Sequence, residues 1–425
     1  MKKLLSFLLS MLLVSALVFS VTACKKEVAG VVLDETVTPI TIKVETELDD
    51  EDVEQKILTE ITLSASAKDY IDKRNFTGLK NLLAKHASSD AKWFTVDAEK
   101  EKVTFTIPEN VTVIASNSVV NLSFITEIIV NDNVTEIEKG AFVGLSGLEE
   151  ITLPFIGGKV GAVNDGKLFA YIFGSIGTDG LTAVTQNYNE GTESTTSLYV
   201  PTSLKTVNVT GKVGLETSDP ILYYINDDNQ HVVIKTVEDA PMCYYDDENV
   251  RHILGEDETA PEGKTAERVA TYSVASEDYK NSAVQPYAFY GITTVETVNF
   301  VNEKIEAIPD YTFYGCTALK VLNFVDSITT IGKYAYSGCS SLREVNFNNV
   351  TEVLEGAFSN CTSLGRSTEI AAGGLNISTL ETIGEGAFTG CTSLNLAKLT
   401  LGDHTAESLE DAFDEGFFET EDTNP

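Results

Sequence analysis

The sequence has few of the residues that build most catalytic and metal-binding sites. Its 425 residues include four histidines and six cysteines, and no two cysteines lie close together in the chain. A zinc site needs converging cysteine or histidine ligands, and no glycine-rich phosphate loop or dinucleotide-binding fingerprint occurs. We therefore expect no metal, no cofactor and no enzyme activity.

Basic residues are also scarce. Thirty Lys and Arg stand against 64 Asp and Glu, which gives a formal net charge of -34 at pH 7. A chain with this charge repels polyanions, so we expect no nucleic acid as a partner. The hydrophobic content of 43% and the charged content of 22% are normal for a folded protein. The acidic excess is therefore interpreted as solvated surface charge.

A long apolar run, Leu4 to Val21, lies at the amino terminus between two lysines and Ala23-Cys24. A basic start, an apolar centre and a small residue before the cut site indicate an export signal. The segment resembles the lipobox of bacterial lipoproteins. That resemblance implies cleavage after residues 1–23, diacylation of the Cys24 sulfur and anchoring by the lipid. The alternatives are a signal peptide with an accidental cysteine, or a retained membrane helix.

Residues 24–55 carry a dense acidic run. Such a run is repelled by an anionic membrane and by itself, which favours an extended tether. Calcium binding is the alternative, but the run lacks the spacing of a calcium loop.

Residues 56–108 are interpreted as an N-terminal cap on the repeats that follow. The pattern from Ile57 to Trp93 is helical, and the alternating run Val103–Ile107, which ends at Pro108, predicts a strand. The helical prediction depends on apolar side chains spaced mostly three to four residues apart: Tyr70, Phe76, Leu79, Leu82 and Leu83.

The dominant feature of the chain is a period of 22–30 residues. An aromatic residue recurs with this period, and we call it the anchor and count positions from it. A small residue precedes most anchors. An apolar residue or a thiol stands at +3, and an aliphatic residue stands at +6. A period of this size indicates stacked units. The spacing +6, +9 and +11 places two side chains on one face of a short strand. The anchors are Phe289, Phe313, Tyr336, Phe358, Phe388 and the faded Phe413, and the same offsets fit Val119 and Phe142.

Two stretches carry the unit most clearly, IGKYAYSGCSSL at 331–342 and GAFTGCTSL at 386–394. They resemble the bacterial BspA-like leucine-rich repeats, whose unit reads roughly I-x-x-I-G-x-x-A-F-x-G-C-x-x-L-x-x-I. The resemblance covers about half of the chain and recurs in register. It implies an α/β-type repeat solenoid, a right-handed array with a curved parallel β-sheet. It also implies a place on the cell surface and a role in adhesion or in binding host proteins or polymers.

The repeats divide the chain further. We expect leucine-rich repeats at 109–153 and 284–401, separated by irregular repeats or a β-rich insertion at 154–283, and a C-terminal cap and tail at 402–425. Within the insertion, Leu204, Val207 and Val209 keep the spacing of a repeat. Inserts in repeat arrays often emerge on the binding face, so 154–283 is a candidate contact region, the alternative being a tolerated loop.

Three asparagines at +10, Asn299, Asn323 and Asn346, are predicted to form an outward row along the sheet. The row is a candidate ligand-binding face for a sugar or an extended peptide. The alternative is that the amides bond to one another along a ladder.

The repeat cysteines are predicted to be buried free thiols, because equivalent side chains in stacked units point the same way. They stand at +3 in four repeats: Cys316, Cys339, Cys361 and Cys391.

The first functional hypothesis is an exported protein, lipid-anchored at Cys24 to the bacterial cell envelope and exposed at the surface. It would bind a protein or polysaccharide as an adhesion or interaction scaffold. The alternative is a structural envelope lipoprotein without a soluble ligand. The third hypothesis, an enzyme with its site in 154–283, has only Cys243 and His252 as a nucleophile and base to offer, and no surrounding motif supports that pair.

Overall fold

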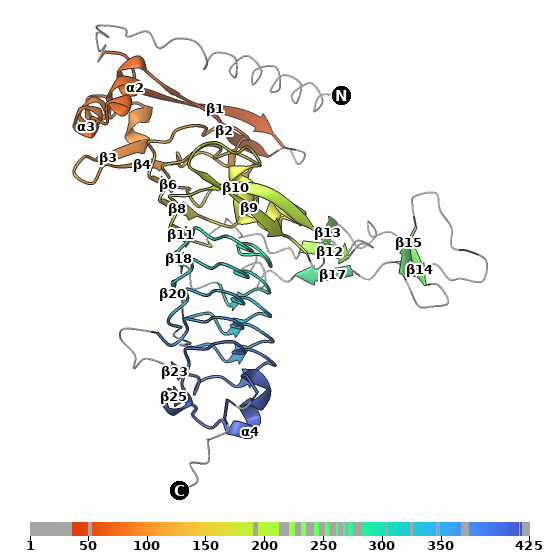
Figure 1. Cartoon of the computed structure of the whole chain (residues 1–425). Coiled ribbons are helices and arrows are strands. Elements are labelled where there is room, and N and C mark those ends of the chain that lie inside the picture. Colours follow the sequence, from red (N-terminus) through yellow and green to blue (C-terminus); the bar gives the residue numbers. More distant parts are fainter. Residues whose placement is uncertain are drawn as a thin grey trace. The chain divides into compact units, whose positions relative to one another are not determined.

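The computed structural model of the chain is shown in Figure 1. All described residues from Thr38 onward belong to one compact unit. The described residues are 36–49, 53–189, 194–211, 283–301, 305–323, 326–345, 347, 349–366, 374–415 and 417–418, with short segments at 221–225, 231–234, 242–245, 251–254, 261, 267–268 and 271–274.

The main sheet takes one short strand from each of several successive repeats. Its order is β20-β18-β11-β8-β6-β4-β3, and every pair is parallel except β3 with β4. Glu127 pairs with Glu150, and Glu150 pairs with Thr206, so equivalent positions of successive repeats lie side by side. The strands are β3 (Phe94–Asp97), β4 (Lys102–Thr106), β6 (Glu127–Ile129), β8 (Glu150–Leu153), β11 (Thr206–Val209), β18 (Thr297–Phe300) and β20 (Val321–Asn323).

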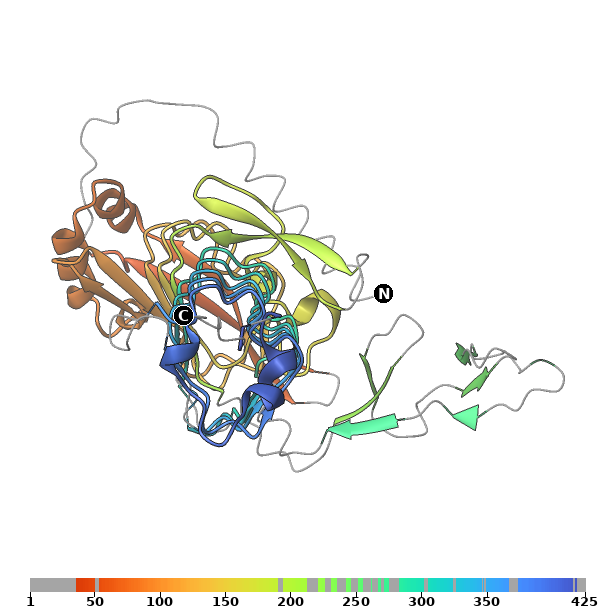
Figure 2. The same ribbon diagram turned by 60° about the horizontal axis from the view of Figure 1, so that its bottom comes forward.

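Further parallel ladders join strands of two residues each. β5 (Val113–Ile114) pairs with β7 (Glu136–Ile137), and β23 (Leu375–Asn376) pairs with β25 (Leu399–Thr400). The later repeats form one ladder in the order β19-β21-β22-β24, and Figure 2 shows their coils lying one over another. These four strands are β19 (Ala307–Ile308), β21 (Thr330–Ile331), β22 (Glu352–Val353) and β24 (Thr382–Ile383). Mostly parallel strands with few helices are typical of a leucine-rich repeat fold.

The described chain begins with a hairpin where the sequence predicted an extended tether. β1 (Ile40–Leu48) pairs antiparallel with β2 (Glu54–Leu63), and β2 continues into a parallel pair with β5. The tether prediction is therefore wrong for 40–48 and 54–55, and the predicted helical pattern is wrong for 57–63. The physical reason is alternation: Ile40 is buried and Ile42 and Val44 pack against the core, while Thr41 and Lys43 between them are exposed.

Two helices follow the hairpin, as the apolar spacing predicts. α2 (Ala65–Asp72) begins after Ser64, whose hydroxyl accepts from the Ala67 N–H at 3.2 Å. α3 (Phe76–Lys85) begins after Asn75, whose side chain accepts from the Gly78 N–H at 2.8 Å. Capping of this kind satisfies N–H groups that have no partner inside a helix. α3 buries four of the predicted apolar residues, namely Phe76, Leu79, Leu82 and Leu83. The remaining helices are short: α4 (Ala406–Leu409) and the 3-10 helices η1 (Asp90–Trp93), η2 (Asn164–Lys167), η3 (Phe169–Phe173), η6 (Leu396–Lys398) and η7 (Glu410–Ala412).

The region 154–283 contributes one strand to the main sheet, β11, and several antiparallel pairs. β9 (Leu181–Asn187) and β10 (Thr195–Pro201) form a hairpin. The repeat spacing of Leu204, Val207 and Val209 is confirmed, because β11 lies between β8 and β18. The other strands form two small antiparallel sheets: β12 (Ile221–Ile225), β13 (His231–Ile234) and β17 (Thr271–Val274), and β14 (Met242–Tyr245), β15 (Arg251–Ile253) and β16 (Glu267–Arg268).

The anchors form a column of rings inside the repeats. The ring centroids of Phe289 and Phe313 lie 4.9 Å apart, those of Phe313 and Tyr336 lie 5.1 Å apart, and the stack continues through Phe358 and Phe388. Each ring is almost completely buried. Burial of a large aromatic side chain stabilises a core by its apolar area and by its ring contacts, so this column is a principal part of the core.

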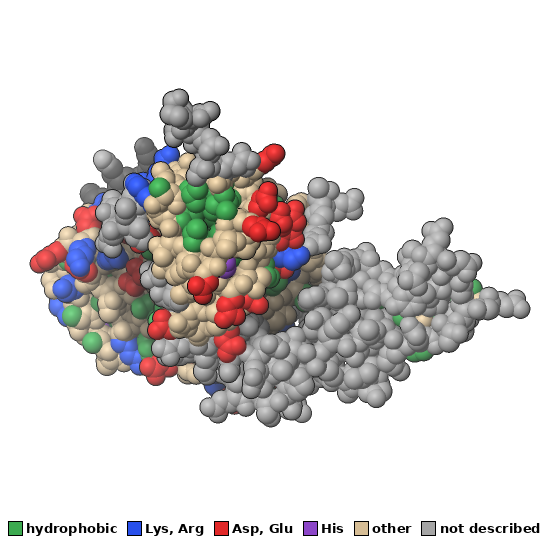
Figure 3. Space-filling model, turned by 90° about the horizontal axis from the view of Figure 1, so that it is seen from below, with side chains coloured by type: hydrophobic (Ala, Val, Ile, Leu, Met, Phe, Trp, Pro, Cys, Tyr) green, Lys and Arg blue, Asp and Glu red, His purple; other side chains and the backbone are tan. Residues whose placement is uncertain are grey.

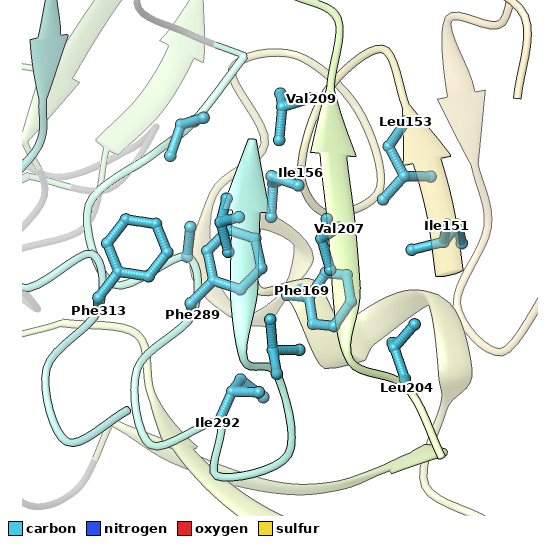
Figure 4. Packing of buried hydrophobic residues seen from close by; sticks show 14 of the residues in the cluster. Ile151, Leu153, Ile156, Phe169, Leu204, Val207, Val209, Phe289, Ile292 and Phe313 are labelled. Atoms are coloured by element: carbon cyan, nitrogen blue, oxygen red, sulfur yellow. The ribbon is translucent and has the colours of Figure 1, made fainter. Parts of the chain in front are cut away.

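The insertion completes the column with rings that the repeat offsets do not predict. In η3, Phe169 stacks on Phe289 with ring centroids 4.8 Å apart, and Figure 4 shows these two rings. The ring of Phe173 lies 6.3 Å from that of Phe142. The Phe142 N–H donates to the Ile172 carbonyl at 2.9 Å, and the Phe169 N–H donates to the Ala288 carbonyl at 2.7 Å. The same bond joins the other repeats, for example Phe313 N–H to the Ala335 carbonyl. One 3-10 turn therefore takes the place of the anchor segment of a repeat.

Candidate functional site

Seven described repeats turn their backbone into the left-handed region at two places, two residues before the anchor and two residues after it. Glycine and asparagine tolerate this conformation, whereas other side chains meet the following carbonyl. The +2 position holds Gly or Asn in all seven, and the −2 position holds Asn117, Gly140, Gly356 and Gly386 in four of them. The faded repeat at Phe413 lacks both turns.

Three successive repeats break this rule with tyrosine. Tyr287, Tyr311 and Tyr334 stand at the −2 position with φ of 67°, 55° and 52°. A bulky residue in this region is an outlier that costs about 1–2 kcal/mol. Strain of this kind, observed in a structure, is a reason to look for a function at that position.

The three strained tyrosines form a row of stacked rings. Tyr287 and Tyr311 lie 4.8 Å apart with an interplanar angle of 6°, and Tyr311 and Tyr334 lie 5.2 Å apart at 22°. A second row stands at the +1 position, where Tyr290 and Tyr314 stack at 4.9 Å and 10°. The two rows touch, because Tyr287 lies 5.9 Å from Tyr290 and Tyr311 lies 6.0 Å from Tyr314.

Between and beyond these rows lies a groove of about 550 Å³, which we call the tyrosine groove. Its volume is within the usual range of small-ligand sites, about 300–1,000 Å³. Tyr287 is buried, while the other four tyrosines are partly exposed. The groove is lined by Asn187, Tyr287, Tyr290, Tyr311, Tyr314, Tyr334, Ser337, Ser359 and Asn360.

One end of the −2 row is closed by a lysine from η2. The Lys167 Nζ lies 5.3 Å from the centroid of the Tyr287 ring, the geometry of a cation–π contact. It also lies 3.4 Å from the Oδ1 of Asn189. Burial lowers the pKa of Lys167 from 10.5 to about 8, because a charged amine is less stable away from water.

The other end of the −2 row is closed by a glycine and a carboxylate. The hydroxyl of Tyr334 donates to Glu355 Oε1 at 2.7 Å, and the Lys333 Nζ lies 3.1 Å from Glu355 Oε2. The hydrogen bond to Glu355 raises the pKa of Tyr334 to about 12. The bonds from Tyr334 and Lys333 lower the pKa of Glu355. The next repeat places Gly356 where the row would continue, so the rings end at Tyr334.

The +1 row ends at Tyr314, one repeat before the −2 row ends, and serines occupy the following +1 positions. The +1 position of the next two repeats holds Ser337 and Ser359, and the Ser359 hydroxyl donates to the Ser337 hydroxyl at 2.7 Å. A serine leaves open the space that a third ring of this row would occupy. One ring face of Tyr314 therefore borders a hollow that contains hydroxyl groups and the Asn360 amide.

The insertion contributes to the groove through β9. Gln186 is completely buried, and its Nε2 donates to the Tyr290 carbonyl at 3.0 Å, while its Oε1 accepts from the Ala170 N–H at 3.1 Å. These bonds tie β9 both to η3 and to the repeat that carries Tyr290. The neighbouring Asn187 is thereby placed in the groove lining. The region 154–283, predicted as a candidate contact region, supplies Asn187 to the groove lining and places Lys167 over Tyr287 at the end of the −2 row.

The predicted asparagine row lies outside the groove lining. The Asn299 Nδ2 donates to the Asn208 Oδ1 at 2.7 Å, and the Asn208 Nδ2 donates to Glu150 Oε1 at 2.9 Å. This is the ladder arrangement weighed as the alternative to ligand binding. Asn208 was missed because the insertion separates it from the regular repeats in sequence. Asn323 ends β20 in the next position of the sheet, while Asn346 and Cys24 lie outside the described residues.

The repeat cysteines are buried and free, as predicted. Each thiol donates to the carbonyl oxygen of the preceding repeat's anchor: Cys316 to Phe289 at 3.0 Å, Cys339 to Phe313 at 3.2 Å, Cys361 to Tyr336 at 3.1 Å, and Cys391 to Phe358 at 3.1 Å. Burial raises the pKa of all four thiols, that of Cys391 to about 12. These cysteines are packing residues rather than nucleophiles or ligands.

Cys243 and His252 do not converge. Cys243 pairs with Ile253 and Tyr244 pairs with His252 across β14 and β15, so the two side chains leave opposite faces of the pair. Within the described part of the chain, no group of three or more His, Cys, Asp and Glu residues is placed to hold a metal ion. The described helices include none with the length and apolar character required to cross a membrane.

The model of one protein family matches most of the chain. Six copies of the BspA type leucine rich repeat region match residues 46–162, 277–373 and 374–420. No curated protein matches the chain.

Three solved structures are similar over long stretches but at low identity. A leucine-rich repeat protein from Bacteroides ovatus is 17% identical over 69% of this chain and 59% of its own, with a TM-score of 0.26. This chain thus spans less than two thirds of that protein. A leucine rich repeat protein from T. pallidum is 12% identical, covering 84% of this chain and 89% of its own, with a TM-score of 0.24. A leucine rich cell surface protein from Faecalibacterium prausnitzii is 16% identical, covering 76% and 96%, with a TM-score of 0.25.

Proposed function

The chain belongs to the BspA-type leucine-rich repeat family, and on this premise we propose that it is a bacterial surface protein that binds a protein or polysaccharide through the tyrosine groove. The observation that carries the proposal is the set of strained tyrosines, Tyr287, Tyr311 and Tyr334. Neighbouring repeats build the same turn with glycine or asparagine, so the fold itself does not require a ring there.

The energetics argue against a purely structural role for these rings. A stacked aromatic pair contributes about 0.5–1.5 kcal/mol beyond its buried area. A left-handed backbone at a tyrosine costs about 1–2 kcal/mol. Two stacked pairs contribute about 1–3 kcal/mol, which is less than the cost of about 3–6 kcal/mol for three strained tyrosines, so ring stacking does not account for the row. A structural envelope protein without a ligand, the second hypothesis, provides no reason for it.

The proposal also covers the handedness of the repeat array, its export and its anchoring. We propose a right-handed solenoid with a curved parallel sheet, exported and anchored through a lipid on Cys24. Support comes from the family match and from the apolar run before Cys24. Display at the cell surface would expose the partly exposed tyrosines to a partner outside the cell.

Attachment assays on a groove variant test the proposal. The variant carries Tyr311→Gly, Tyr334→Gly and Tyr314→Ser, and each new residue is the one that other repeats already hold at the equivalent position. Wild-type and variant chains are compared for binding to immobilised host matrix proteins and to a panel of glycans. We expect the variant to lose binding and to keep the circular dichroism and melting temperature of a folded chain.

The matched control is Asn299→Ser, which changes the main sheet and leaves the groove lining intact. It is expected to bind as the wild type does. Equal binding by the groove variant, or loss of binding only in the Asn299 control, contradicts the proposed site. Protease treatment of intact cells tests the location, since a surface protein should release its repeats into the supernatant and a Cys24→Ala variant should not remain anchored.

A further inference from the structure

We infer that the ligand of the tyrosine groove is an uncharged polysaccharide, and that one of its sugar rings lies on the open face of Tyr314. This inference rests on the proposed function, because it names the chemical class that the same site would take.

The lining consists of aromatic rings, hydroxyl groups and amides. None of its nine residues is Asp, Glu, Lys or Arg. A sugar ring presents an apolar C–H face that packs on an aromatic ring and hydroxyl groups that pair with hydroxyls and amides. An apolar surface with a few placed polar groups is the usual composition of a ligand pocket. The lining therefore matches an uncharged, hydroxyl-rich ligand.

The spacing of the rings disfavours a peptide. The ring centroids of neighbouring tyrosines in each row are 4.8–5.2 Å apart, the distance of rings in direct stacking contact. No slot remains between them for a proline or another side chain, whereas recognition of a proline-rich or strand peptide needs pockets for alternate side chains. A flat sugar ring needs only an uncovered face, and Tyr314 offers one beside Ser337 and Ser359.

The hollow beside Tyr314 has partners for sugar hydroxyls. Ser359 donates its hydrogen to Ser337, so the Ser337 hydroxyl still has its own hydrogen to donate. Asn360 lines the same hollow and has both a donor and an acceptor in its amide. A sugar that stacks on Tyr314 could thus bond to Ser337 and Asn360 at its rim.

The charge of the protein restricts the polysaccharide further. The formal net charge is -34, and Asp and Glu side chains are spread over the face in Figure 3. The Lys167 amine lies over Tyr287 instead of lining the groove. A uronic acid or sulfated polymer would be repelled at long range and would find no cation in the lining. An uncharged glycan meets neither obstacle.

The groove is long enough for a chain of sugars. Its lining comes from four successive repeats, those anchored at Phe289, Phe313, Tyr336 and Phe358. Neighbouring parallel strands are about 4.8 Å apart, so four repeats span roughly 15 Å. This length favours an oligosaccharide segment over a single sugar.

Calorimetry with the full mature chain tests the inference. The probes are uncharged glycans, namely maltohexaose, cellohexaose, laminarin and mannan, with heparin as the acidic comparison. We expect at least one uncharged glycan to bind and heparin not to bind. Tyr314→Ser should weaken that binding by about tenfold or more, the ratio that corresponds to about 1.4 kcal/mol. Tyr314→Phe, which keeps the ring, should bind within about threefold of the wild type.

The remaining outcomes separate this inference from the proposed function. If no uncharged glycan binds, and Tyr314→Ser abolishes attachment of a protein partner, the glycan inference is overturned and the groove remains the binding site. Glycan binding that Tyr314→Ser does not change, or binding of heparin alone, also overturns it. If groove variants change neither glycan nor protein binding, both proposals fail. Unchanged melting temperatures of the two Tyr314 variants show that each result reports on the groove.

Discussion

The ring of Tyr334 lies directly over Gly356, so closely that a Cβ atom on residue 356 would stand 2.2 Å from Tyr334 Cε1. Tyr334 and Gly356 occupy the same position of consecutive repeats, both with positive φ. The row of strained tyrosines therefore ends because the following repeat has no side chain there, and the glycine provides the space in which the last ring lies.

We expect Gly356→Ala to destabilise the protein by more than backbone strain alone, which is about 1–2 kcal/mol, and to displace Tyr334. Gly386→Ala is a matched control. Residue 386 has the same sign of φ, but its added Cβ would meet only Thr389 Oγ1 at 3.6 Å. Urea unfolding of both variants measures the difference. Equal losses in the two variants would show that the Tyr334 ring moves aside without cost.

Because of its hydrogen bond to Glu355, Tyr334 is expected to ionise at a higher pH than an ordinary tyrosine. The pKa of Tyr334 is raised to about 12, so the stabilising bond is fully present below the usual pKa near 10 and is lost as the pH rises through about 12. Ultraviolet titration of tyrosinate, as the difference between wild type and Tyr334→Phe, measures this ionisation. Glu355→Gln should return the pKa toward 10, and an unchanged titration in that variant would contradict the assignment.

Lys167 is expected to make stability depend on pH in the alkaline range. Its pKa in the folded protein is about 8 against a usual value of 10.5, so between these values the unfolded chain binds more protons. The free energy of unfolding contributed by this group therefore rises as the pH rises from about 8 to 10.5. Urea unfolding at pH 7 and pH 9.5 should show a larger gain for the wild type than for Lys167→Met. Lys333→Met, which removes an exposed amine, serves as the control, and identical gains in wild type and Lys167→Met would refute the prediction.

The repeat cysteines should resist thiol reagents in the folded protein. Cys339 and Cys361 are completely buried, and burial raises the pKa of each thiol, so almost no reactive thiolate forms at pH 8. Peptide mapping after treatment with iodoacetamide should find these residues unmodified in buffer and modified in urea. Labelling of Cys339 in buffer at the urea rate would mean that the repeats open far more readily than their packing indicates.

Phe169→Ala is expected to cost about 3–5 kcal/mol, the usual range for removing a buried phenylalanine. The ring stacks on Phe289 and lies 5.5 Å from Phe173, so it joins the repeats before and after the insertion. Hydrogen exchange should show loss of protection in the repeats on both sides of the insertion. Tyr314→Ser, at the partly exposed groove, should leave protection nearly unchanged. If Phe169→Ala has the smaller effect, η3 is not part of the continuous core.

Much of the fold was accessible from the sequence because stacked repeats place equivalent residues side by side. The anchors, the +6, +9 and +11 positions and the buried thiols of Cys316 to Cys391 all follow from one period. The same reasoning recovered β11 from Leu204, Val207 and Val209. It failed for β1, because Glu45, Glu47 and the acidic residues that follow the strand obscured the alternation of Ile40, Ile42 and Val44.

The site was less accessible, although its tyrosines stand at constant offsets. The rows at −2 and +1 recur at constant offsets in the sequence, whereas the predicted site was the strand position of Asn299, whose side chain bonds to Asn208. The Gly and Asn residues at the −2 position of other repeats indicate positive φ there, but nothing in the sequence indicates that Gln186 anchors β9 beside Tyr287, Tyr311 and Tyr334.

The sequence by itself determined the repeat, its family and its buried column, because these depend on local spacing that recurs in register. Only the tertiary structure decided where the column continues across the insertion and where a groove opens. Those features depend on contacts between residues far apart in the chain, such as Phe169 with Phe289 and Gln186 with Tyr290. The number of residues between such partners depends on the length of the insertion, so the repeat period does not predict these contacts.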